Sequence, residues 1–338
     1  MKRKKLLQNN LAAPAAFLFV NLIWGAANPI IKYTLEYIPP FTFLFLRLLI
    51  VCIILLPYVS ALLLKNNINK KDYPNFILLG LLSQSSIAII FLALKYTASM
   101  DATIISIIGG AMIIYLGHKL YGEKMNNFIK YGVFITIAGT LLTVFEPLVG
   151  NNHNSIPTHY RVAGNALAVI YNLTWVVYVI WSKMNSNPEK FKGGVKVILT
   201  KFKIKPMTKN YPPSLIAVLS MYVGLFTTIP LAVLENLGIF EANTFLMNQI
   251  DIHGILGLLY MSLFSSIVAF ILYQWALDKG RVSESAIFGY LGPVFSFPIA
   301  HLLLGEVPTT SLIISAVIVV IGVIIAETGQ QIVSRKHT

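Results

Sequence analysis

The chain has 338 residues, of which 56% are hydrophobic and 12% are charged, and its mean hydropathy is +0.73. Soluble domains carry about 25% charged residues, so this composition excludes a soluble globular protein and indicates an integral membrane protein. The single cysteine, Cys52, excludes a disulfide framework and a cysteine-ligated metal site. The formal net charge of +13 would suit a nucleic-acid-binding protein, unless the positions of the basic residues along the chain have another cause.

Apolar stretches long enough to cross about 30 Å of hydrocarbon recur along the whole chain. The basic start before the first stretch resembles a signal peptide, but the stretch is too long and more follow, so we expect no cleavage. We predict an all-α membrane protein with ten transmembrane helices, at residues 12–33, 40–64, 74–97, 101–121, 127–149, 161–183, 212–236, 253–278, 282–304 and 308–330.

The basic residues are distributed unevenly between the two sides of this predicted bundle. With the N-terminus in the cytoplasm, 22 of the 26 Lys and Arg residues fall on the cytoplasmic side. Lys32, Lys95 and Arg161 fall on the opposite side, and Arg47 lies inside a span. Cytoplasmic loops are enriched in Lys and Arg, so we expect a multi-pass protein of the plasma membrane with both termini in the cytoplasm. The net charge therefore reports topology, and no nucleic-acid partner is expected.

The two halves of the chain repeat one pattern. A shift of 183 residues aligns 90–144 with 273–327 without a gap and gives ten identities in 55 positions. A shift of 151 aligns the first and sixth spans, and a shift of 173 pairs prolines of the second and seventh. The matches include Asn21-Leu22-Ile23-Trp24 with Asn172-Leu173-Thr174-Trp175, Lys32 with Lys183, Ala93-Leu94 with Ala276-Leu277, His118 with His301, Gly122-Glu123 with Gly305-Glu306 and Gly139 with Gly322.

Each repeat contains five spans, so the second repeat must enter the membrane in the opposite orientation. We predict two inverted five-helix repeats at 12–149 and 161–330, joined by an outer linker at 150–160. Many secondary transporters have this architecture, because two related halves can expose one central site to either side in turn.

The motifs of both repeats resemble one known family. The start of the chain resembles the beginning of an EamA domain in Trp24-Gly25…Lys32 and Ile38-Pro39-Pro40…Arg47. The end resembles a second EamA domain in Gln274-Trp275-Ala276-Leu277…Pro293…Leu304-Gly305-Glu306…Gly322. The chain is thus similar over nearly its whole length to ten-span members of the drug/metabolite transporter superfamily. The resemblance implies a secondary carrier that exports amino acids or other small metabolites without a nucleotide-hydrolysing subunit.

Candidate solute-binding residues are polar or aromatic groups within spans and the residues at helix breaks. We expect matched breaks at Gly109-Gly110 and Gly292-Pro293, because interrupted helices line the sites of such transporters. Amides in mid-bilayer cost free energy unless they are hydrogen-bonded, so they should face the interior, either as ligand contacts or as bonds between helices. The predicted solute-binding residues are Trp24, Asn28, Gln84, Gly110, Asn172, Trp175, Tyr178, Gln274, Tyr290 and Pro293.

Arg47 is the basic residue that lies well inside a span, about 10 Å beyond Pro40. A charge at this depth costs several kcal/mol unless it is paired or hydrated. It either attracts a carboxylate or phosphate on the solute or forms a structural pair with Asp101 or Glu36. We therefore treat Arg47 as a candidate charge site.

The matched His118/His301 and Glu123/Glu306 pairs suggest a metal site or a proton relay. However, inversion sends the two pairs to opposite faces of the membrane, so they cannot form one metal site. Glycine at 122 and 305 more simply ends one helix, and the glutamate meets the N-terminus of the next. Proton coupling through one of these His or Glu residues stays open as an alternative. We expect no catalytic residues, no metal, no cofactor and no enzymatic activity.

The loop at about 185–211 is rich in lysine and longer than the resemblance leads us to expect. Such a loop is predicted either to contact anionic lipid headgroups or to be a solvated insertion. The expected partners are thus a small-molecule solute and membrane lipids. Efflux of lipophilic drugs and a lipid flippase or scramblase remain as alternative functions.

Overall fold

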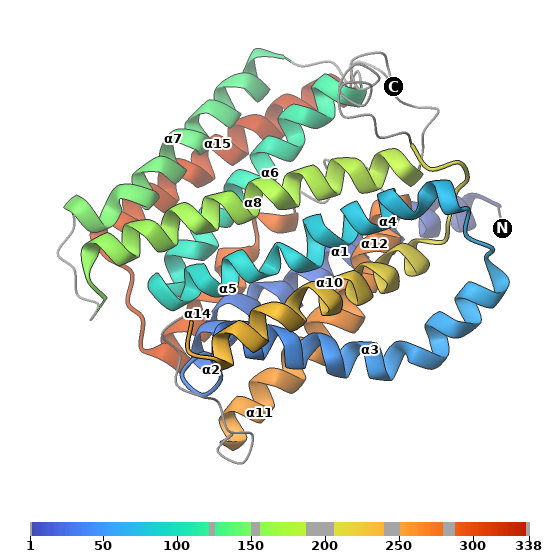
Figure 1. Ribbon diagram of the computed structural model, residues 1–338. Helices are drawn as coiled ribbons and strands as arrows, with labels where there is room; N and C mark the ends of the chain where they lie inside the picture. The colour runs from blue at the N-terminus through green and yellow to red at the C-terminus, as the bar shows by residue number, and fades with distance from the viewer. Residues whose placement is uncertain are drawn as a thin grey trace.

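The computed structural model describes residues 2–121, 126–149, 156–186, 206–239, 251–279 and 288–335, and all regular structure in these ranges is helical. Figure 1 shows a bundle of long helices packed side by side. The first repeat contains α1 (Lys2–Gly25), α2 (Ala27–Thr34), α3 (Pro40–Lys65), η1 (Lys70–Asp72), α4 (Tyr73–Gly80), η2 (Leu81–Ser85), α5 (Ile87–Tyr96), α6 (Ser99–Tyr121) and α7 (Asn127–Val149). The second contains α8 (Thr158–Ser186), α10 (Pro213–Asn236), α11 (Ile252–Leu259), η5 (Tyr260–Ala269), α12 (Phe270–Lys279), α14 (Gly292–Leu304) and α15 (Thr310–Arg335).

The predicted ten-helix membrane architecture is confirmed. Among the described residues, eight helical segments are long and apolar enough to cross a membrane, and two shorter apolar helices, Gly292–Leu304 and Thr310–Ala326, complete the set of ten. Residues 282–287 of the predicted ninth span lie outside the described residues. α1 begins and α15 ends at the same end of the bundle (Figure 1), which we call the terminal end; the opposite end is the far end.

Corresponding helices of the two halves run in opposite directions. α1 leads away from the terminal end, whereas α8 runs toward it, and α3 and α10 are opposed in the same way (Figure 1). The third and eighth spans are also interrupted at matched positions, because η2 and η5 are both π-helical. A π-helical segment inserts one residue into the helix and exposes backbone groups. This common irregularity supports the inverted relationship between the two halves.

The first span is broken, and the fourth is not. α1 ends at Gly25 and α2 begins at Ala27, because the ring of Pro29 conflicts with the carbonyl four residues earlier. The break predicted at Gly109-Gly110 is wrong, since α6 continues through both residues. Unlike proline, glycine keeps its backbone N–H, and it lowers helix stability by only about 1 kcal/mol relative to alanine. Packing on either side is therefore enough to hold this helix together.

At Pro293 the prediction of a break holds only in part. Pro293 lies in the first turn of α14, where its missing N–H has no helical partner to lose, so it begins the helix after a turn at Tyr290 and Leu291. The second proline of this span, Pro298, lies inside α14.

Buried carboxylates join the two halves at the far end. The side chain of Glu306 accepts hydrogen bonds from the backbone N–H groups of Ser99 and Met100 and so caps the N-terminus of α6. Glu235 accepts from the backbone of Phe41 and Thr42 in the same way and caps α3. Glu306 thus meets the N-terminus of a helix in the other repeat rather than that of the helix that follows it.

The glycine at the end of α14 behaves as predicted. Gly305 has φ 63°, in the left-handed region that favours glycine, and ends the helix. The matched Gly122 and Glu123 lie outside the described residues.

A buried ion-pair network lies beside these caps. Arg161 donates from Nε and Nη2 to the two oxygens of Asp101 at 2.8 and 2.9 Å, and Nη2 also lies 2.9 Å from a carboxylate oxygen of Glu146. Glu146 in turn accepts from the hydroxyls of Thr309 and Ser311 at the start of α15. These contacts link α6, α7, α8 and α15.

Most of the lysine-rich loop, residues 187–205, lies outside the described residues. The part that follows is attached to the first repeat, where Asp72 accepts hydrogen bonds from Thr208 and from the hydroxyl of Tyr211. Burial, with a smaller contribution from the hydrogen bond to Asp72, raises the pKa of Tyr211 to about 12.

Candidate functional site

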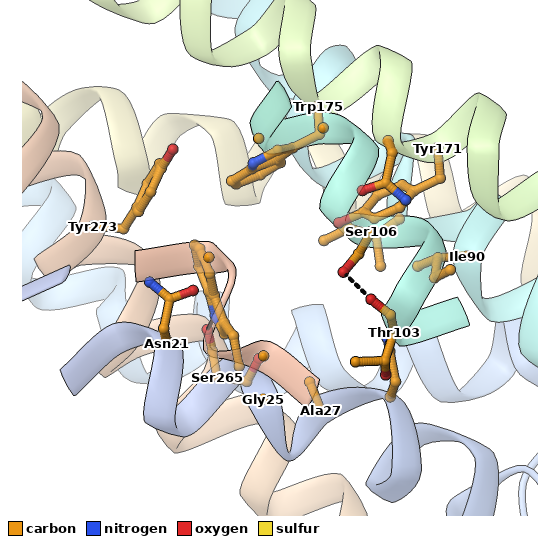
Figure 2. A pocket seen from close by; sticks show the side chains of 18 of the residues that line it. Asn21, Gly25, Ala27, Ile90, Thr103, Ser106, Tyr171, Trp175, Ser265 and Tyr273 are labelled. Carbon is orange, nitrogen blue, oxygen red and sulfur yellow. Dashed lines mark hydrogen bonds between the residues drawn. The ribbon is translucent and has the colours of Figure 1, made fainter. Parts of the chain in front are cut away.

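A cavity of about 210 Å³ lies at the centre of the bundle, between the two repeats. Its lining comes from α1, α2, α3, α5, α6, α8, η5, α12 and the segment that leads into α14. Figure 2 shows Tyr171, Thr103 and Ser106 on one side of the opening and Tyr273, Trp175 and Asn21 around the other. The site is therefore shared by both halves.

One wall of the cavity is aromatic. The indoles of Trp24 and Trp175 meet edge to face with ring centroids 5.5 Å apart, and Tyr273 lies 5.0 Å from Trp24 and 5.5 Å from Trp175. Edge-to-face and tilted pairs at these separations are favoured by the ring quadrupoles. Residues at matched positions of the two repeats thus meet at the centre of the molecule.

The π-helical segment of the eighth span holds two of the lining residues in place. The indole N–H of Trp24 donates to the backbone carbonyl of Ser265 at 3.1 Å, and Nε of Arg47 donates to the hydroxyl of Ser266 at 2.6 Å. Ser266 itself donates to the carbonyl of Met261, five residues earlier. The irregular backbone is therefore used to anchor the lining, in keeping with the frequent occurrence of such segments at functional sites.

Three asparagines of the lining present acceptor atoms. Nδ2 of Asn21 donates to the carbonyl of Phe17, and Nδ2 of Asn172 donates to the carbonyl of Ala168. Nδ2 of Asn28 donates to the Thr103 hydroxyl at 3.2 Å. A backbone carbonyl only accepts, so the Oδ1 atoms of Asn21 and Asn172 face away from these bonds. Within the described part of the chain, no donor reaches the Oδ1 atom of any of the three.

Gly109 and Gly110 allow two lining residues to approach α6 closely. A Cβ atom on Gly110 would lie 2.8 Å from the ring of Tyr290, and one on Gly109 would lie 3.3 Å from Oδ1 of Asn172. Any larger residue at 110 would displace Tyr290. The two glycines thus shape the cavity without breaking the helix.

Arg47 contributes a charge to the lining. Its side chain is only 4% exposed, and its one hydrogen bond among the described residues is the Nε bond to Ser266. Of the alternatives given for Arg47, the structural pair with Asp101 is contradicted, because Asp101 binds Arg161 instead. Glu36 is exposed, and within the described ranges it forms no ion pair with Arg47.

Seven of the eleven residues predicted from the sequence line the cavity: Trp24, Asn28, Arg47, Gly110, Asn172, Trp175 and Tyr290. Four do not. Tyr178 packs behind Trp175 and donates to Gln274, which donates to Ser182, so both form a support for the aromatic wall. Gln84 is buried against Gly224, and Pro293 lies just past the lining residue Gly292.

The prediction missed several lining residues, including Asn21, Thr103, Ser106, Tyr171, Ser265 and Tyr273. Helical spacing could have found some of them. Asn21, Trp24 and Asn28 recur at three- and four-residue intervals, and so do Thr103, Ser106 and Gly110. Ser265 contributes through an irregular helix, which no spacing rule identifies. No group of three metal-ligating side chains is found in the described part of the chain.

Two related halves of five membrane helices around one central cavity are typical of membrane transport proteins. Comparison with known families agrees, and the chain belongs to the EamA-like transporter family, whose sequence profile matches residues 12–145 and 199–328. The match covers both halves.

The similarity to other known proteins extends over almost the whole chain. It is 25% identical over 313 residues to an uncharacterized transporter of Archaeoglobus fulgidus, covering 91% of this chain and 95% of that protein. It is 24% identical over 320 residues to a "probable amino-acid metabolite efflux pump" of Salmonella typhimurium, with 92% and 93% covered. A protein of the same description from Escherichia coli is 23% identical over 321 residues, with 92% and 93% covered.

A solved crystal structure has the same fold. It superposes with a TM-score of 0.60 at 17% identity, and the match covers 96% of this chain and 99% of that one.

Proposed function

We propose that this protein is a secondary-active transporter that exports small metabolites such as amino acids by alternating access to the central cavity. The observation that carries this proposal is that matched residues of the two repeats, Trp24 and Trp175, meet in the cavity wall. A site on the axis between two inverted halves can face either side of the membrane when the halves tilt. The plasma membrane location with cytoplasmic termini belongs to the same proposal and rests on the distribution of Lys and Arg.

The size of the cavity favours a small solute. At about 210 Å³ it is smaller than the roughly 300–1,000 Å³ of sites for drug-sized ligands. Lipophilic cationic drugs would also need a counter-charge, and no Asp or Glu is among the described lining residues. Both points make drug efflux a weaker candidate than metabolite export.

The chemistry of the lining suits a polar solute with a small apolar part. The amide oxygens of Asn21, Asn28 and Asn172 are available to accept from an ammonium or amide, and the aromatic wall offers apolar contact. Two of the similar proteins carry the description "probable amino-acid metabolite efflux pump", which agrees with such a solute. The described residues of the lining do not form a catalytic arrangement, so we propose a carrier rather than an enzyme.

Transport can be tested with the purified protein in liposomes, by counterflow of a set of radiolabelled neutral amino acids. We expect exchange by the wild type and a loss of at least about tenfold in Trp175→Ala, which removes a cavity wall. Trp275→Ala is the matched control, because Trp275 lies on α12, is 37% exposed and does not line the cavity.

Two results would contradict the proposal. If no amino acid exchanges, the proposed solute class is wrong. If both tryptophan variants behave alike, the cavity is not the solute site. A parallel assay with fluorescent phospholipid in the same liposomes covers the flippase alternative. Lipid translocation without amino-acid exchange would replace the proposal with that function.

A further inference from the structure

The central cavity contains a cation, Arg47, that has no counter-ion among the residues the structure describes. Arg47 comes from α3, its side chain is 4% exposed, and its Nη groups have no hydrogen-bond partner among the described residues. Nε is already committed to Ser266, whose own proton goes to the carbonyl of Met261. The guanidinium is thus fixed at one nitrogen and available at the others.

The buried carboxylates of the far end are already engaged. Asp101 and Glu146 bind Arg161, Glu235 caps α3, and Glu306 caps α6. No Asp, Glu or Lys is among the described lining residues, so the lining carries a single positive charge. An unpaired charge at this depth is costly, and an anion supplied from outside would offset that cost.

We propose that Arg47 is the residue that binds the carboxylate of the transported solute, through its Nη groups, while Ser266 holds Nε. This inference rests on the proposed function of the cavity and names the chemical class of its solute. Guanidinium and carboxylate are both planar, so two parallel N–H to O bonds form readily. Lysine would supply the charge without this geometry.

The charge balance selects a carboxylate over a phosphate monoester. A phosphate monoester carries about −1.5 to −2 charges at neutral pH, and one guanidinium would leave it partly uncompensated in a water-poor site. A carboxylate carries one negative charge and is neutralised by Arg47 alone. The amide oxygens of Asn21, Asn28 and Asn172 then remain for a donor elsewhere on the solute.

Thermal stabilisation of the full-length protein in detergent tests the inference with matched pairs of probes. The pairs are L-valine and L-valinamide, isovalerate and isovaleramide, and L-phenylalanine and L-phenylalaninamide. In each pair only the carboxylate is replaced by an amide. We expect the wild type to bind at least one acid about tenfold or more tightly than its amide, because a charge-assisted pair is lost.

Variants assign this preference to Arg47. In Arg47→Gln the acid and amide should bind within about twofold of each other, and Arg47→Lys should retain part of the preference. Lys130→Gln, which removes an exposed cation on α7, should keep the full preference. If Arg47→Gln does not fold, the wild-type comparison and Arg47→Lys still decide the question.

The outcomes separate this inference from the proposed function. Equal binding of acid and amide by the wild type, or an unchanged preference in Arg47→Gln, overturns the role of Arg47 and leaves a neutral-solute carrier. Tight binding of phenyl phosphate with no binding of any acid overturns the carboxylate assignment. Failure of every probe to stabilise the wild type removes the proposed function together with the inference.

Discussion

Lys32 and Lys183 make equivalent contacts in the two halves of the chain. Nζ of Lys32 donates to the carbonyls of Leu94 and Thr97, at the end of α5, at 3.1 and 2.5 Å. Nζ of Lys183 donates to the carbonyl of Leu277, the residue that matches Leu94, at 2.6 Å, and to that of Asp278 at 3.2 Å. The two contacts lie at opposite ends of the bundle. An inverted repeat requires this placement, because each lysine caps a helix that runs the opposite way.

Replacing either lysine should therefore destabilise the protein in a similar way. A lysine at a helix C-terminus satisfies carbonyls that have no helical partner and interacts favourably with the helix dipole. We expect Lys32→Met and Lys183→Met each to lower the free energy of unfolding by about 1.5–3 kcal/mol, the range for hydrogen bonds to a charged group. The fraction of folded protein after heating, followed by size-exclusion chromatography, measures the change.

The exposed Lys95 at the end of α5 provides the control for this prediction. Lys95→Met removes the same charge next to the same helix end but is expected to change stability by less than about 0.5 kcal/mol. Equal losses in all three variants would show that charge alone, and not the cap, is responsible.

Gln84 and Gln274 are expected to respond in opposite directions to the same substitution. Both are 1% exposed, but the two amide atoms of Gln84 have no hydrogen-bond partner among the described residues, whereas Gln274 bonds to Tyr178 at 2.7 Å and to Ser182 at 2.6 Å. A buried polar group without a partner costs about 1–3 kcal/mol. Gln84→Met should therefore raise the melting temperature, and Gln274→Met should lower it.

A fall in the melting temperature of Gln84→Met would contradict this account and indicate that its amide is satisfied in the membrane. The same variants test transport. Neither side chain lines the cavity, so Gln84→Met should retain amino-acid exchange. Any loss of exchange in Gln274→Met should be indirect, because this variant removes the hydrogen bond that supports Tyr178.

The buried ion pair of Arg161 and Asp101 should contribute strongly to the stability of the folded protein, and this contribution should require both partners. Removing one member of a buried ion pair typically costs about 3–5 kcal/mol, because the other charge is left without compensation. Arg161→Met leaves the carboxylates of Asp101 and Glu146 unpaired, so we expect strong destabilisation. Thermal unfolding of the single and double variants measures the effect.

In the double variant Arg161→Met/Asp101→Leu, one of the two unpaired charges is gone, and stability should recover in part. If the double variant is as unstable as the sum of the single ones, the two residues are not coupled, and the network does not act as a pair.

Glycines allow the fifth and tenth spans to pack at close range. A Cβ on Gly322 of α15 would lie 2.6 Å from the backbone nitrogen of Thr136, and one on Gly132 of α7 would lie 2.4 Å from that of Ala326. Close approach at small residues is a common basis of helix association in membranes. Gly322→Ala should push α15 away from α7 and lower the melting temperature.

Gly289→Ala is the matched change for this prediction, because the nearest described atom to its added Cβ, Oδ1 of Asn21, lies 3.9 Å away. We expect it to be neutral or stabilising, since alanine loses less conformational entropy on folding. A loss as large as that of Gly322→Ala would mean that helix flexibility, and not close packing, explains both results.

The amino-acid sequence by itself determined the number and nature of the helices. Hydropathy acts through local composition, so a run of about 20 apolar residues forms a spanning helix wherever it occurs. The repeat was also visible, because matched pairs such as Trp24 with Trp175 and Lys32 with Lys183 retain identical residues. An odd number of spans in each repeat then implied the inversion without any knowledge of packing.

The tertiary structure decided which polar groups face the cavity. Gln84 and Asn172 are both amides in mid-span, yet only Asn172 lines the cavity, since the rotation of each helix depends on neighbours that are distant in sequence. The carboxylate partner of Arg161, and the lack of one for Arg47 within the described ranges, were likewise set by packing between the repeats. The sequence correctly indicated that Gly109 and Gly110 lie at the centre of the bundle, but it wrongly predicted a helix break there. A helix kept intact by its neighbours cannot be recognised from composition. Side-chain contacts across the bundle, rather than local pattern, therefore define the candidate site.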